Sequence, residues 1–153
     1  MGELIWPTNG AIYLDANCFI YSVEKIDPYR TILDTLWQAI SDGQVKVITS
    51  ELTLLEVLIK PLKEKDMFTA AIYRIILRHS PDVHMIPVTQ TILENAANLR
   101  ASLNLKTPDA IHAATAMLHE SALLVTNDSG FRRIPDLKLM ILNEMTLQNE
   151  DDV

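Results

Sequence analysis

The sequence predicts a three-layer α/β fold, in which helices cover both faces of a central parallel sheet of about five strands. Short apolar runs alternate along the chain with longer segments whose apolar residues recur every three or four positions. The short runs are apolar at nearly every position, as expected of strands that are buried on both faces. The chain contains no internal repeat and no long linker. These three observations together favour one doubly covered sheet.

The size of the chain supports one compact domain. It has 153 residues, of which 48% are hydrophobic, enough for a substantial core. We expect a single domain over residues 1–148 and an acidic tail without fixed structure over residues 149–153. No apolar run approaches the roughly 20 residues that span a bilayer, and the N-terminus lacks the features of a signal peptide. The expected protein is therefore cytoplasmic and has no membrane contact.

The first half of the chain is expected to contain two strands and four helices. A strand over residues 11–15 leads into a short helix that Asn17, a good N-cap residue, begins. Apolar spacing predicts a helix over residues 29–40. A strand over residues 45–48 precedes a helix capped by Thr49-Ser50, and Pro61 is expected to divide that helix from the next. The core-facing residues expected in this last helix, which ends near Arg78, are Met67, Ala71, Ile75 and Ile76.

The second half of the chain is expected to alternate strands and helices more regularly. A strand over residues 83–86 is followed by a helix that Thr89 caps. The segment Thr107-Pro108-Asp109 opens the next helix with a cap, a proline at the first helical position and an acid in the first turn. Two further strands are expected over residues 123–126 and 137–142, with a loop over residues 127–130 between them. Cys18, the only cysteine, lies in an apolar run and is interpreted as a core residue.

Four carboxylates are expected to meet at one edge of this sheet. Asp15 ends the first strand and Asp128 follows the fourth, and parallel strands carry both to the same edge. Glu56 and Asp109 lie near the starts of helices that begin just after strands. Each acid also has an ordinary interpretation. Asp15 and Asp128 are suited to caps or turns, Glu56 to a solvated helix face, and Asp109 to the positive end of a helix dipole.

A cluster of four carboxylates predicts a bound cation. Two unit charges about 4 Å apart repel by roughly 4 kcal/mol at an effective dielectric near 20, which is large beside a typical folding stability of about 5 to 15 kcal/mol. Oxygen ligands without clustered Cys or His favour Mg²⁺ or Mn²⁺ over zinc. Such an ion can activate water and assist displacement at a phosphodiester, so phosphodiester hydrolysis is the predicted chemistry. His112 is interpreted as a packed histidine, and His79, His84 and His119 show no metal-ligand spacing.

With these motifs the sequence resembles the PIN-domain nucleases, and most closely the VapC-type toxins of toxin-antitoxin modules. The segments that carry the resemblance are Leu14-Asp15-Ala16-Asn17, Ser50 to Glu56, Pro108-Asp109-Ala110-Ile111-His112-Ala113-Ala114-Thr115-Ala116 and Thr126-Asn127-Asp128-Ser129-Gly130-Phe131. The resemblance extends over about residues 11–142. One departure is Ser129-Gly130, which stands where many members of the family carry a second acid, so Asp128 is alone after the fourth strand.

The resemblance implies a divalent-metal-dependent endoribonuclease that acts as the toxin of a toxin-antitoxin pair. Its implied Mg²⁺ or Mn²⁺ ligands and catalytic residues are Asp15, Glu56, Asp109 and Asp128, with Asn17 and Thr126 as the polar residues beside them. It also implies a homodimer and a cognate antitoxin. Lys60, Arg132 and Arg133 are candidates to hold the RNA backbone, although each also suits an ordinary solvated surface. The net charge of −7 argues against broad electrostatic binding of nucleic acid, so a local site is expected.

Two other functions fit parts of the sequence. A catalytically inactive PIN-like RNA-binding or protein-interaction module would use the acids for stability or ion-dependent folding, and loss of an acid would favour it. No expected acid is missing. An aspartyl-phosphate phosphatase would need a second Asp two residues after the first as a general acid. Asn17 occupies that position and cannot donate a proton in that role.

Overall fold

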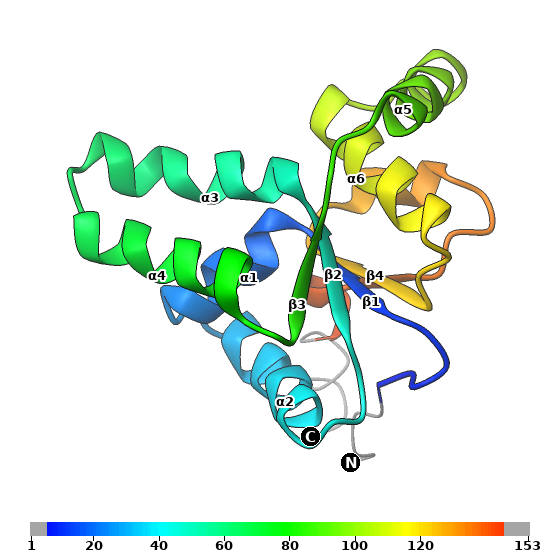
Figure 1. Ribbon diagram of the computed structural model, residues 1–153. Coiled ribbons are helices and arrows are strands. Elements are labelled where there is room, and N and C mark those ends of the chain that lie inside the picture. Colours follow the sequence, from blue (N-terminus) through cyan, green and yellow to red (C-terminus); the bar gives the residue numbers. More distant parts are fainter. Residues whose placement is uncertain (1–5, 146–153) are drawn as a thin grey trace.

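A single parallel sheet forms the centre of the protein. The computed structural model describes residues 6–145, and within them five strands pair in the order β3-β2-β1-β4-β5 (Figure 1). All four pairings are parallel. The strands are β1 (Ile12–Leu14), β2 (Val47–Ser50), β3 (Val83–Ile86), β4 (Leu123–Thr126) and β5 (Leu139–Ile141). The predicted fold class is confirmed.

Helices cover both faces of the sheet (Figure 1). They are α1 (Ala16–Val23), α2 (Tyr29–Ser41), α3 (Glu51–Lys63), α4 (Met67–His79), α5 (Gln90–Leu103), α6 (Thr107–Leu118) and the short 3₁₀-helix η1 (Ser129–Arg133). Because successive side chains of a strand point to opposite faces, Ile12 and Leu14 of β1 join a core with α1, α2 and α4. Tyr13 lies between them in sequence and joins the other core, with α5 and α6.

Several local predictions are confirmed. Ser50 caps α3 by accepting a hydrogen bond from the backbone N–H of Leu52, and Thr89 caps α5 through Ile92. Cys18 is fully buried, as expected of a core residue. Among the helices of residues 6–145, none is long and apolar enough to cross a membrane. The predicted acidic tail, residues 149–153, lies outside the described residues.

The helix cap predicted at Asn17 is wrong. Helix α1 begins one residue earlier, and its N-cap is Asp15, whose side chain accepts a hydrogen bond from the backbone N–H of Cys18. Strand β1 ends at Leu14, so Asp15 is the junction residue and has the extended backbone conformation that an N-cap requires. Asn17 is an exposed residue of the first helical turn. The cap predicted at Thr107 is also wrong. The N-cap of α6 is Lys106, whose side chain makes no capping hydrogen bond.

The expected break at Pro61 is also wrong, because α3 continues through Pro61 to Lys63. The proline ring is buried on the same face as Thr53 and Val57, and this packing offsets the missing N–H. The chain turns instead at residues 64–66, where Lys65 has a positive φ of 55° and Asp66 caps α4.

The predicted core face of α4 is wrong as well. Its buried residues are Ala70, Tyr73 and Leu77, whereas Met67 and Ile75 are 58% and 59% exposed. Ala71 is also exposed, and Ile76 is partly buried. Helix α4 is apolar on more than one side, so its spacing does not identify a single inward face. Between β4 and β5, the predicted loop is partly replaced by η1.

Candidate active site

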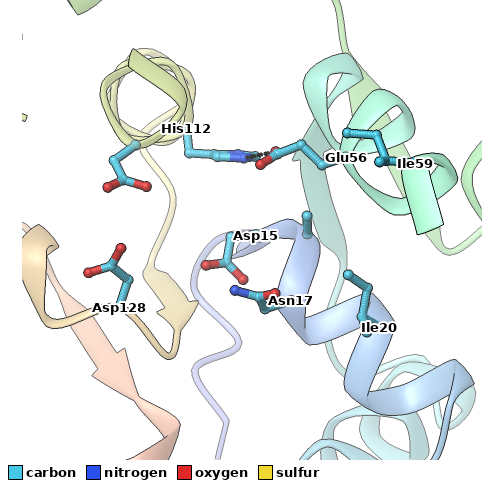
Figure 2. A pocket seen from close by; sticks show the side chains of 9 residues that line it. Asp15, Asn17, Ile20, Glu56, Ile59, His112 and Asp128 are labelled. Carbon is cyan, nitrogen blue, oxygen red and sulfur yellow. Dashed lines mark hydrogen bonds and ion pairs between the residues drawn. The ribbon is translucent and has the colours of Figure 1, made fainter. Parts of the chain in front are cut away.

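The four predicted acids line one cavity at the reversal of strand order. The chain adds β2 and β3 on one side of β1 and then β4 on the other. In open α/β sheets, ligands bind at the carboxyl ends of the strands at such a switch point. A cavity of about 250 Å³ lies there, and Asp15, Glu56, Asp109 and Asp128 all line it, with Asn17 and His112. Figure 2 shows Asn17, Glu56, His112 and Asp128 around Asp15. We call this space the acid cavity.

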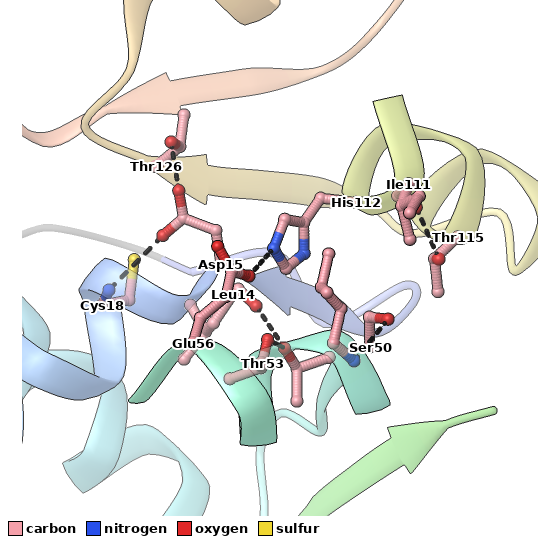
Figure 3. A network of polar contacts seen from close by, with 12 residues as sticks. Leu14, Asp15, Cys18, Ser50, Thr53, Glu56, Ile111, His112, Thr115 and Thr126 are labelled. Atoms are coloured by element: carbon pink, nitrogen blue, oxygen red, sulfur yellow. Dashed lines mark hydrogen bonds and ion pairs between the residues drawn. The ribbon is translucent and has the colours of Figure 1, made fainter. Parts of the chain in front are cut away.

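Asp15 is the most buried of the four acids, at 6% exposure. The hydroxyl of Thr126 donates a hydrogen bond to its Oδ2 (Figure 3), and the backbone N–H of Cys18 donates to its Oδ1. Burial raises the pKa of Asp15, although the hydrogen bond from Thr126 acts in the opposite direction. Thr126 is fully buried at the end of β4. Its hydrogen bond therefore fixes the orientation of the Asp15 carboxylate.

Asp109 and Asp128 form a pair on the other side of the cavity. Burial first, and then the negative charge of Asp128, raise the pKa of Asp109 to about 6. Asp128 caps η1, since its Oδ1 accepts a hydrogen bond from the backbone N–H of Gly130 at 2.8 Å. A Cβ atom at Gly130 would lie 3.0 Å from that same oxygen. The glycine in the Ser129-Gly130 departure thus allows the close turn that holds Asp128.

Glu56 is bound to a buried histidine. Its Oε1 lies 2.6 Å from Nε2 of His112, and the other ring nitrogen of His112 contacts the hydroxyl of Tyr13. The interpretation of His112 as a packed histidine is confirmed by its 2% exposure. The sequence analysis missed its contact with Glu56 and its place in the lining of the acid cavity. The available signal was its position one helical turn after Asp109, on the same face of α6.

The acids do not form a closed metal cage. Within residues 6–145, no group of three or more Asp, Glu, His or Cys side chains lies close enough together to hold a metal ion. Asp15 is directed to Thr126, Glu56 to His112, and Asp109 interacts with Asp128. The donor set nevertheless fits a hard divalent cation, because it consists of carboxylate oxygens. The raised pKa values of Asp15 and Asp109 also indicate desolvated acids that a cation would stabilise in their charged form.

The three basic candidates differ in position. Lys60 pairs with Glu24 at 2.9 Å, and Arg132 pairs with Glu144. Neither lines the acid cavity. Arg133 lines an adjoining cavity of about 240 Å³, which shares Asp109 and Asp128 with the first.

A second basic residue, Lys106, also lines the adjoining cavity. The sequence analysis missed it, although its place directly before the helix that carries Asp109 was the available signal. Arg133 is anchored there by a 3.1 Å hydrogen bond from its Nη1 to the carbonyl of Asn104. The acid pair is therefore bordered by Lys106 and Arg133.

The parallel sheet and the acids at its switch point are those of a PIN domain. The PIN domain family model matches residues 12–137, and the chain belongs to this family. PIN domains are in general nucleases that use a divalent metal. None of the curated proteins matches the sequence.

Solved structures from toxin-antitoxin systems have the same fold. A toxin-antitoxin complex from Klebsiella pneumoniae is 26% identical, with a TM-score of 0.65 over 86% of this chain and 98% of that chain. VapC20 from Mycobacterium tuberculosis, a sarcin-ricin loop cleaving toxin, is 19% identical, with a TM-score of 0.67 over 80% and 93%. VapBC2 from Rickettsia felis, bound to a DNA fragment from its promoter, is 20% identical, with a TM-score of 0.65 over 86% and 98%.

Proposed function

We propose that this protein is a divalent-metal-dependent endoribonuclease that hydrolyses RNA phosphodiester bonds. The observation that carries the proposal is the lining of one cavity by Asp15, Glu56, Asp109 and Asp128, which come from four separate parts of the chain. Membership of the PIN family supports nuclease chemistry. The likeness to VapC20, which cleaves the sarcin-ricin loop, supports RNA as the substrate.

The four carboxylates are the proposed ligands of Mg²⁺ or Mn²⁺, directly or through water. When bound, the ion supplies Lewis-acid stabilisation of the negative charge that develops at the phosphate. The chain's own residues prepare the site for it. Thr126 holds Asp15 with its hydroxyl and accepts a hydrogen bond from the backbone N–H of Asp128 at 3.1 Å. Asn17, an exposed residue of the cavity lining, offers an amide to the substrate.

Lys106 and Arg133 are the proposed contacts to the RNA backbone. They border the acid pair in the adjoining cavity, and cationic side chains bind phosphates with a strength that falls with added salt. Placing them next to the acids keeps the positive charge local, in agreement with the net charge of −7. Lys60 and Arg132 already pair with acids, so each would have to leave its carboxylate partner to bind a phosphate.

We further propose that the protein is the toxin of a toxin-antitoxin pair and forms a homodimer. The toxin-antitoxin complexes among the similar structures support the first part. Large apolar side chains are exposed on α3 and α4, with Leu55 at 59% and Phe68 at 78%. Exposed apolar patches of this kind are typical of protein interfaces. They support binding to a partner or to a second copy of the chain.

The second candidate function is a PIN-like module without catalysis. The observation that favours it is the absence, within residues 6–145, of three metal-binding side chains already close together. In that case the acids would serve only stability or ion-dependent folding, and the surface of α3 and α4 would carry the function.

A cleavage assay separates the two functions. Purified protein is incubated with a mixed pool of tRNA and rRNA in Mg²⁺, in Mn²⁺ and in EDTA. The variant Asp15→Asn keeps a side chain that can cap α1 and removes the charge. Asp34→Asn, at an exposed position of α2, is the matched control. We expect cleavage that requires metal, disappears in Asp15→Asn and persists in Asp34→Asn. Folded wild-type protein that neither cleaves RNA nor binds either ion would favour the non-catalytic module.

A further inference from the structure

Three side chains form a series of hydrogen bonds from the sheet to the acid cavity. The hydroxyl of Tyr13, fully buried on β1, lies 2.6 Å from Nδ1 of His112 on α6. Nε2 of His112 lies 2.6 Å from Oε1 of Glu56 on α3 (Figure 3). The two rings also meet edge to face, with centroids 5.8 Å apart. The contacts join three elements that are far apart in sequence.

The donors and acceptors along these two hydrogen bonds have one consistent direction. An ionised carboxylate only accepts hydrogen bonds, so Nε2 of His112 donates to Glu56. The other nitrogen of a neutral imidazole is an acceptor, and the Tyr13 hydroxyl is the donor that reaches it. The Tyr13 hydroxyl therefore selects the tautomer of His112 that presents an N–H to Glu56.

We propose that Tyr13 and His112 are positioning residues, which fix the carboxylate of Glu56 so that it can serve the metal site. This inference rests on the proposed function. The His112 bond occupies Oε1, and among residues 6–145 the other oxygen of Glu56, Oε2, has no hydrogen-bond partner. A free glutamate side chain loses rotamer entropy when it is ordered. A carboxylate that is already held loses less of this entropy on binding a cation.

A purely structural role for these hydrogen bonds is the competing explanation. A buried hydroxyl and a buried imidazole cost free energy unless both are hydrogen-bonded, and apolar side chains would fill the same space without that cost. The series of hydrogen bonds ends at Glu56, whose side chain is 28% exposed and lines the acid cavity. The bonds thus order a group at the site and not a group of the core. The two explanations differ in what they predict for metal binding.

The test compares two tyrosines that have the same hydrogen-bonding chemistry. Tyr13→Phe removes the hydroxyl that orients His112. The matched control is Tyr73→Phe, because the equally buried Tyr73 donates to Oε2 of Glu24 at 2.6 Å and does not line the acid cavity. Mn²⁺ affinity is measured by calorimetry on the full chain, kcat and KM on RNA, and thermal stability on each variant. Partners that orient metal ligands typically contribute about 10- to 100-fold in affinity or activity.

We expect Tyr13→Phe to weaken Mn²⁺ binding by about 10-fold and to lower kcat with little change in KM, whereas Tyr73→Phe changes neither. His112→Leu should lose more Mn²⁺ affinity and more kcat than His112→Gln, because a glutamine amide can still donate a hydrogen bond to Glu56. If both tyrosine variants bind Mn²⁺ as wild type does, while Glu56→Gln weakens binding, the positioning role is wrong and the metal site stands. If the wild-type protein binds no Mn²⁺, the proposed function fails and the positioning role fails with it.

Discussion

The substitution Asp109→Asn tests the electrostatics of the acid cavity. The pKa of Asp109 rises from 3.8 to about 6, first through burial and then through the charge of Asp128. At about 1.4 kcal/mol per pKa unit, a shift of that size corresponds to about 3 kcal/mol. Because the side chain is only partly buried, solvent screening reduces the expected effect to roughly 1 kcal/mol. The Asn side chain does not ionise and removes this repulsion.

The sign of the pH dependence follows from the direction of the shift. A group whose pKa is raised in the folded state stabilises it fully below the unfolded pKa, here 3.8, and this contribution is lost as pH rises through about 6. Without metal, Asp109→Asn should therefore match wild type near pH 4. At pH 7.5 it should be more stable by roughly 1 kcal/mol, or about 2 to 4 °C in Tm.

Thermal melts in EDTA at both pH values measure this difference, with Asp34→Asn as the control at an exposed position. In a second series with Mn²⁺ at pH 7.5, wild type should melt at a higher temperature than Asp109→Asn. The ion stabilises the wild-type carboxylates and has one ligand fewer in the variant. The reasoning would be refuted if Asp109→Asn had the same Tm as wild type at pH 7.5 in EDTA. It would also be refuted if the variant's increase in Tm were as large at pH 4 as at pH 7.5.

Three further predictions concern the substrate, the Asp128 turn and the core. Lys106→Ala and Arg133→Ala should each raise KM for RNA and reduce the salt dependence of binding by about one unit of slope; measuring KM at several salt concentrations tests this. Gly130→Ala should lower kcat by roughly 3-fold or more, because its Cβ would lie 3.0 Å from an Asp128 oxygen; unchanged kcat would contradict it. Leu33→Ala should destabilise by about 2 to 5 kcal/mol, since Leu33 is fully buried, and urea unfolding measures the loss.

The sequence by itself determined the fold class and the position of the acids. Apolar runs alternating with helical periodicity predict a parallel sheet, and parallel strands end on one side. This direction predicts that Asp15 and Asp128 lie at the same edge of the sheet. That they line one cavity also requires β1 and β4 to be neighbours in the sheet. The caps at Ser50 and Thr89 were also predictable, because a capping side chain bonds to the backbone only two or three residues away.

Only the tertiary structure decided how the side chains of the site are paired. The link from Tyr13 through His112 to Glu56 joins positions 99 and 56 residues apart, and no local pattern specifies such a contact. The buried face of α4 and the passage of α3 through Pro61 depend likewise on packing against neighbouring elements. Local spacing determines which faces of a helix can be buried. The free energy of burial against the rest of the protein determines which of these faces is buried in the folded state.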